Sequence, residues 1–279
     1  MHDLDRDVPP TPEDHPEPGE APAHVDVLSL RLDFGSRNVL DGLSCRFAEG
    51  KISVILGASG VGKSTLLRII AGLQKPDYGD VWIGGKEITR MPNRELKDVR
   101  QHIGMMFQHG ALLDSMTVFD NVALALREHT NFSESEIADR VHAQFEAVGL
   151  RDVNELLPGE LSGGMKKRAA LARAMVAEPD ILLCDEPLSG LDPIAVRMIE
   201  SLLADVSQRS KVTMILTSHH IGSTLRMADH VIYMVGGAAI CGAPNQLTRS
   251  ADPRVRAFFE AAGPGEMPRS RLPRWEDAR

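Results

Sequence analysis

Residues 57–64 constrain more than any other segment what this chain can fold into. They read Gly-Ala-Ser-Gly-Val-Gly-Lys-Ser and begin at the last glycine of KISVILG, an apolar run rich in β-branched residues that predicts a buried strand. The next run, KSTLLRIIAGL, has helical spacing. Glycines let the backbone wrap closely around a phosphate, and the N–H groups of the loop and of the helix start favour an anion. The pattern therefore predicts a phosphate-binding loop, in preference to a glycine-rich turn without a ligand.

A second candidate site lies at the end of another apolar run, residues 181–186, which reads Ile-Leu-Leu-Cys-Asp-Glu. Carboxylates are costly to bury, so both acids should emerge at the carboxyl end of the strand, where α/β proteins bind ligands. We expect Asp185 to hold Mg²⁺, directly or through water, and Glu186 to orient or deprotonate the attacking water. In the first loop, Lys63 would reach the β- and γ-phosphates, and the Ser64 hydroxyl would ligate Mg²⁺. Taken alone, the two acids also read as a solvated turn.

The segment Leu-Ser-Gly-Gly-Met at residues 161–165 precedes the helical run KKRAALARAMVAEP. Ser162 and the two glycines are typical of a helix start that binds an anion. Without its context, the same segment reads as an ordinary N-cap.

Strands and helices alternate along most of the chain. Besides the two strands above, KVTMILTS and HVIYMVG predict buried strands, and helical stretches such as IAVRMIESLLADVSQ lie between them. This alternation predicts an α/β fold with a largely parallel sheet covered by helices. VDVLSLRLDF and VLDGLSCRF alternate apolar and polar residues and predict two further strands, whereas residues from about 93 to 158 predict a helical subdomain inserted into the core.

Composition separates the first residues from the body of the chain. Residues 1–24 hold six prolines, seven acids and one base, a charge of −6, so we expect an acidic, disordered tail. The chain carries −8, which leaves −2 for the rest and argues against nucleic-acid binding, since that needs a basic face. No uncharged apolar run reaches the roughly 20 residues of a membrane-spanning helix. We therefore expect any membrane anchor to come from a partner, and the three scattered cysteines to be reduced thiols.

Together these motifs resemble the ABC ATPase family, over residues from about 25 to 245. The segment at 161–165 is similar to the family signature LSGGQ, with Met in place of Gln. Gln108 matches the glutamine that links nucleotide to transporter, and residues 189–192 match the loop that carries signals across the dimer. His219 matches the switch histidine by its spacing to Ala228-Asp229, although a second histidine follows it. Phe34 lies where an aromatic residue stacks on adenine, with a core position as the alternative.

The resemblance implies an ABC-type P-loop NTPase with an antiparallel β subdomain near the N-terminus, working as a head-to-tail homodimer in which one phosphate loop meets the partner's signature. The implied cofactors are ATP and Mg²⁺. The implied catalytic residues are Glu186, His219 and Lys63, and the implied metal ligands are Ser64, Gln108 and Asp185. The implied ATP-binding residues are Phe34, Gly57, Ala58, Ser59, Gly60, Val61, Gly62, Lys63, Ser64, Thr65, Gln108, Ser162, Gly163, Gly164 and Asp192.

Three details are similar to the ATPase subunits of Mla-type phospholipid transporters: LSGGM followed by KKRAALARA, the segment MMFQHGALLDSMTV, and the tail segment DPRVRAFF. This resemblance implies a peripheral subunit at the cytoplasmic face of the bacterial inner membrane. Its partners would be an MlaE-like integral membrane permease and an MlaD-like MCE-domain lipid-binding protein. The resemblance also allows a small STAS-type regulator as a further partner. We divide the chain into a tail (1–24), the ATP-binding domain (25–250) and a C-terminal extension (251–279). That extension is expected to contact the neighbouring ATPase subunit, with a disordered end as the alternative.

Three other functions are weighed against this one. The motor of a small-solute importer, for example for amino acids, would share the chemistry and differ in its partners. A soluble ABC protein of DNA repair or translation would carry a coiled-coil insertion, tandem cassettes or basic patches, and the sequence shows none of these. A binding-only regulatory ABC domain would lack Glu186 or His219, and both are present.

Overall fold

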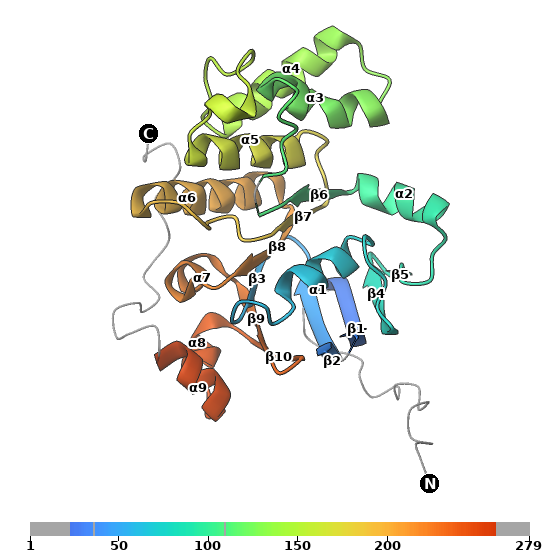
Figure 1. The fold of residues 1–279 in the computed structure, drawn as a ribbon, viewed down its shortest axis with the longest axis vertical. Coiled ribbons are helices and arrows are strands. Elements are labelled where there is room, and N and C mark those ends of the chain that lie inside the picture. Colours follow the sequence, from blue (N-terminus) through green and yellow to red (C-terminus); the bar gives the residue numbers. More distant parts are fainter. Residues whose placement is uncertain (1–22, 36, 109, 261–279) are drawn as a thin grey trace.

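Two sheets form the frame of the protein in the computed structural model, which describes residues 23–35, 37–108 and 110–260 (Figure 1). The larger sheet has the strand order β10-β9-β3-β8-β7-β6, and the smaller has the order β2-β1-β4-β5. All pairings in the larger sheet are parallel except that of β10 with β9, and all pairings in the smaller sheet are antiparallel. The predicted α/β fold, with a mostly parallel core sheet and an antiparallel subdomain, is confirmed.

The strands are β1 (Ala23–Phe34), β2 (Arg37–Ala48), β3 (Ile52–Leu56), β4 (Tyr78–Ile83), β5 (Lys86–Glu87), β6 (Ile103–Met106), β7 (Ile181–Cys184), β8 (Thr213–Ser218), β9 (His230–Val235) and β10 (Ala238–Gly242). The helices are α1 (Lys63–Ile70), α2 (Asn93–Gln101), α3 (Val118–His129), α4 (Glu134–Ala147), the 3₁₀ turn η2 (Pro158–Glu160), α5 (Gly163–Met175), α6 (Pro193–Ser210), α7 (Ile221–Met227), α8 (Pro244–Leu247) and α9 (Pro253–Glu260).

The central strands are apolar throughout because the sheet is covered on both faces. Successive side chains of a strand point to opposite faces. In β7, Ile181 and Leu183 pack with α1 and the small sheet, whereas Leu182 and Cys184 pack with α5 and α6. This two-sided burial fixes the register of the strand whose end carries Asp185 and Glu186.

Helices α3 and α4, which lie between β6 and β7 along the chain, both begin with a side-chain cap. Thr117 caps α3 by accepting a hydrogen bond from the Asp120 N–H, and Ser133 begins α4 with a reciprocal capping box involving Glu136. Helices α3, α4 and α5 lie at the opposite end of the molecule from α9 (Figure 1). Within the range 93–158 proposed for the insertion, β6 pairs with β7 and so belongs to the large sheet.

The two ends differ in part from expectation. Strand β1 begins at Ala23, and His24 Nδ1 lies 2.7 Å from Thr213 Oγ1, so ordered structure starts before residue 25. Residues 1–22 and 261–279, which hold most of the expected tail and the end of the extension, lie outside the described residues. The described part of the extension forms α9, whose Val255 and Phe258 pack on β9, with the Phe258 ring 4.8 Å from that of Tyr233. Over the described residues, no helix is long and apolar enough to cross a membrane.

Candidate active site

The phosphate loop lies between the end of β3 and the start of α1, and its neighbours leave no room for larger side chains. A Cβ on Gly57 would lie 2.8 Å from the Met234 carbonyl oxygen of β9. A Cβ on Gly62 would lie 2.9 Å from a methyl carbon of Val39 on β2, and its φ of 108° is one that other residues rarely adopt. The glycines therefore allow the backbone to turn tightly into the helix and leave its N–H groups available to an anion.

Lys63, the first residue of α1, is 6% exposed and lies within its own loop. Its Nζ donates hydrogen bonds to the Gly57 and Ala58 carbonyl oxygens at 2.9 and 3.1 Å. The same Nζ lies 3.5 Å from Glu186 Oε1. The ammonium thus stands between the phosphate loop and the acidic end of β7, where the phosphates of a nucleotide would meet both.

Asp185 is held by two hydroxyl groups from neighbouring elements. Ser64 Oγ and Thr217 Oγ1 donate to Asp185 Oδ1 at 2.8 and 2.7 Å. Thr217 Oγ1 also accepts from the Glu186 N–H at 2.8 Å. Mg²⁺ prefers oxygen ligands, so the adjacent Ser64 hydroxyl and Asp185 carboxylate fit this ion.

Gln108 enters the same region from β6. Strand β6 pairs in parallel with β7, and the Asp185 N–H donates to the Met106 carbonyl at 2.8 Å, which places Gln108 just beyond the paired strand ends. The side chain of Gln108 is exposed. Its backbone carbonyl accepts a hydrogen bond from Lys167 Nζ at 2.5 Å, so the loop is tied to α5.

Glu186 contacts the predicted switch histidine directly. His219 Nδ1 lies 2.7 Å from Glu186 Oε2, and His219 follows the end of β8. The backbone of Glu186 is left-handed, with a φ of 48°. Such conformations cost a non-glycine residue roughly 1–3 kcal/mol and persist where the surroundings over-determine them. The two acids thus leave the strand in different directions, one toward Ser64 and one toward Lys63 and His219.

The signature segment lines a hollow that is separate from the phosphate loop. Ser162 is the N-cap of α5, and its side chain accepts from the Met165 N–H at 3.3 Å. Together with the start of α6 it forms a hollow of about 300 Å³ that includes no residue of the phosphate loop. Asp192, which caps α6 by accepting from the N–H groups of Ile194 and Ala195, lines the same hollow. Within one chain, therefore, the signature and residues 57–65 face separate spaces.

Phe34 lies at the end of β1 and is 55% exposed, so the alternative of a core position is wrong. It pairs in register with Arg37, whose Nη2 donates to the Gly60 carbonyl at 2.6 Å. An exposed ring therefore lies on a segment tied to the phosphate loop, as adenine stacking would require.

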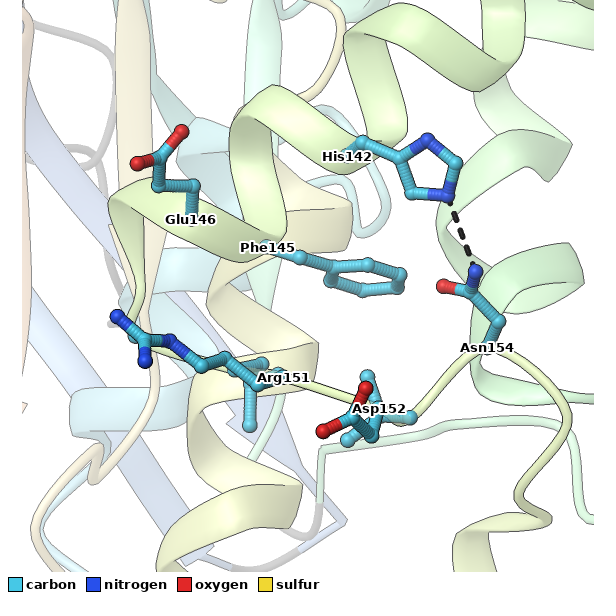
Figure 2. Close-up of a pocket in the computed structure, with 9 residues that line it drawn as sticks. His142, Phe145, Glu146, Arg151, Asp152 and Asn154 are labelled. Atoms are coloured by element: carbon cyan, nitrogen blue, oxygen red, sulfur yellow. Dashed lines mark hydrogen bonds between the residues drawn. The ribbon is translucent and has the colours of Figure 1, made fainter.

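Another pocket, of about 290 Å³, lies where α4 ends (Figure 2). His142, Phe145 and Asn154 line it, with a 3.0 Å contact between His142 Nε2 and Asn154 Nδ2. No motif singled out in the sequence contributes to it.

Two contributors to the site were missed by sequence reasoning, Thr217 and Lys167. Thr217 could have been found, because it ends a buried strand of the same parallel sheet, and the carboxyl ends of such strands share one edge. Lys167 shares a helix face with Ala170, Leu171 and Ala174, which are buried. A charged residue on an apolar helix face was the available signal.

Comparison with known proteins agrees with this geometry. The family model for the ABC transporter matches residues 40–189. The intermembrane phospholipid transport system ATP-binding protein MlaF of Haemophilus influenzae is 41% identical over 244 residues, 87% of this chain and 92% of that protein. MlaF of Escherichia coli K12 is 40% identical over 245 residues, covering 88% and 91%. The dimeric, post-hydrolysis structure of the ATP-binding cassette MJ0796 with ADP and Pi superposes with a TM-score of 0.73, at 28% identity, over 79% of this chain and 98% of that one. The chain therefore belongs to the ABC transporter family and is an ATP-binding, ATP-hydrolysing subunit.

Proposed function

We propose that this chain is the ATPase subunit of a complex that transports phospholipid between membranes. The observation that carries the proposal is the 40–41% identity to two MlaF proteins, which extends over nearly the whole of those proteins and beyond the ATP-binding motifs. The described part of the extension, α9, packs against β9, as a folded part of the subunit would.

In this proposal each polar residue of the site has one task. Lys63 leaves the Gly57 and Ala58 carbonyls to meet the β- and γ-phosphates, while the loop N–H groups hold them. Ser64, Asp185 and Gln108 would hold Mg²⁺, and the ion would neutralise charge on the phosphates. Glu186 orients the attacking water or accepts its proton. His219, already paired with Glu186, contacts the γ-phosphate. Phe34 stacks on the adenine.

The separate position of the signature hollow supports a site shared between two copies. Ser162, Gly163 and Gly164 would close on the nucleotide held by the partner's phosphate loop, and Asp192 would lie at the same contact. A helix N-terminus aimed at the γ-phosphate stabilises negative charge that grows during transfer. The homodimer is therefore the unit that hydrolyses ATP, and the C-terminal extension would add to its contact.

The membrane partners would be a permease of the MlaE type and an MCE-domain protein of the MlaD type, which would place this subunit peripherally on the cytoplasmic face of the inner membrane. A small STAS-type regulator would be a further partner.

Purification of the tagged chain from membranes of its own host, followed by mass spectrometry of proteins and lipids, tests the proposal. We expect a permease, an MCE-domain protein and bound phospholipid. Recovery with a periplasmic solute-binding protein and without lipid would instead support a small-solute importer. A Glu186→Gln variant is the matched control in vesicles containing the complex, since it should assemble equally well yet lose ATP-dependent movement of labelled phospholipid.

A further inference from the structure

Lys167 lies on α5, five positions after Ser162, and points into the protein. Although it is a lysine, it is only 7% exposed. Burial lowers the pKa of its ammonium, and the nearby Cys184, Glu186 and Asp185 oppose that shift. A buried ammonium is costly unless it is hydrogen-bonded, so its contacts identify what the residue does.

Three segments that surround the site meet at the Lys167 Nζ atom. It donates hydrogen bonds to the Gln108 carbonyl at 2.5 Å, to the Glu186 carbonyl at 3.2 Å and to Ser189 Oγ at 3.4 Å. Gln108 follows β6, Glu186 follows β7, and Ser189 begins the loop that leads to Asp192. One side chain on the signature helix thus joins the Gln108 loop, the acidic strand end and the loop before α6.

The contact between Lys167 and Glu186 lies next to a left-handed backbone position. The carbonyl of Glu186 accepts from Lys167 Nζ, from Ser189 Oγ at 2.9 Å and from the Ser189 N–H at 3.1 Å. These donors hold the peptide that follows a left-handed residue, a conformation that glutamate does not favour by itself. With this backbone, the Glu186 carboxylate lies 3.5 Å from Lys63 Nζ and 2.7 Å from His219 Nδ1.

We propose that Lys167 is a positioning residue for ATP hydrolysis: from the signature helix it fixes the backbone of Glu186 and the Gln108 and Ser189 loops in the arrangement that presents the Glu186 carboxylate. This inference rests on the proposed role of Glu186. Lys167 acts through the three loops that it joins.

The test compares full-length variants in steady-state ATP hydrolysis and in nucleotide binding. Lys167→Met keeps the length of the side chain and removes its donors. We expect kcat to fall by about tenfold or more, as expected for loss of hydrogen bonds from a charged group. The Kd for ATP and the number of bound nucleotides per chain should stay unchanged, because residues 57–65 are untouched. Lys167→Arg, which keeps a buried cation with several donors, should recover most of kcat.

Lys166→Met is the matched control, because it makes the same substitution at the next position of the same helix and should retain wild-type kcat. Should Lys167→Met not fold, Ser189→Ala carries the test, since it removes the hydroxyl that bonds both Lys167 and Glu186. It should lower kcat without changing the Kd for ATP.

Wild-type kcat in folded Lys167→Met, or in Ser189→Ala if that variant carries the test, would overturn the inference. So would an equal loss in Lys166→Met, or a loss matched by the same drop in the fraction of chains that bind ATP. Glu186→Gln, measured alongside, separates the two hypotheses. If it is inactive while Lys167→Met is fully active, only the positioning role fails, whereas an active Glu186→Gln overturns the role of Glu186 itself.

Discussion

Thr217→Val removes a single oxygen at the centre of the site while keeping the shape of the side chain. Thr217 is fully buried on β8, and its hydroxyl both donates to the Asp185 carboxylate and accepts from the Glu186 N–H. After the substitution, Asp185 Oδ1 keeps its bond from Ser64. The Glu186 N–H loses the acceptor that it has in the wild-type protein.

The cost follows from these two bonds. A hydrogen bond to a charged group contributes about 1.5–3 kcal/mol, and a buried donor left without a partner costs about 1–3 kcal/mol. Because Ser64 compensates in part, we expect a loss near the lower end of the sum, about 3 kcal/mol. For a chain of this size, that corresponds to a fall in Tm of roughly 6–12 °C. Hydrolysis should fall as well, since both acids lose a positioning contact.

Differential scanning calorimetry measures the first effect and steady-state ATP hydrolysis the second. Ser53→Ala is the matched control: Ser53 is fully buried on the adjacent strand β3, and its hydroxyl has no hydrogen-bond partner among the described residues. Its removal should leave Tm unchanged or raise it. If Thr217→Val has the same Tm as the wild type, or if Ser53→Ala lowers Tm as much as Thr217→Val does, the hydroxyl network does not hold the two acids.

Further predictions concern Lys63, Gly62 and the cysteine thiols. Lys63→Ala should weaken ATP binding, because it deletes the ammonium that we propose meets the phosphates, and undiminished affinity by calorimetric titration would contradict that role. Gly62→Ala should lower both Tm and ATP affinity, because its φ of 108° and a side chain of β2 at 2.9 Å exclude a Cβ; a variant that behaves like the wild type would show that the loop has room. Iodoacetamide near pH 8 should label the buried Cys45 and Cys184 slowly in the folded chain and quickly in urea. Burial raises the pKa of Cys184 to about 12 and raises that of Cys45 well above its usual value, so thiolate is scarce at that pH. Rapid labelling of either thiol in the folded chain, read by mass spectrometry, would refute this.

The parts of the fold that sequence predicts well are those in which a local pattern agrees with tertiary packing. Strands β3, β7, β8 and β9 are apolar because both faces of the large sheet are covered, and their hydrophobic runs are visible directly. Strands β4 and β10 were not predicted. Residues 238–242 form a strand because they pair with β9, and residues 78–83 because they pair with β1, and neither partner can be read from the segment itself.

The residues of the site also fall into those that the sequence predicts and those that it misses. Lys63, Ser64, Asp185, Glu186 and His219 lie together because the loops that follow parallel strands meet at one edge of the sheet, which spacing and order could indicate. The two contributors that reasoning missed act through distant partners. The role of Lys167 depends on two backbone carbonyls and one hydroxyl presented by three other segments, and no sequence pattern encodes where those groups lie. The left-handed backbone of Glu186 is likewise set by tertiary contacts.

Whether ATP is bound between two copies of this chain is tested most directly by light scattering of the Glu186→Gln variant, with and without ATP. Because hydrolysis is blocked, the closed form should accumulate. We predict a particle of twice the 30.5 kDa chain mass with ATP, holding one nucleotide per chain, and a smaller particle without it. A variant that binds ATP yet stays monomeric at saturating ATP would contradict the shared site.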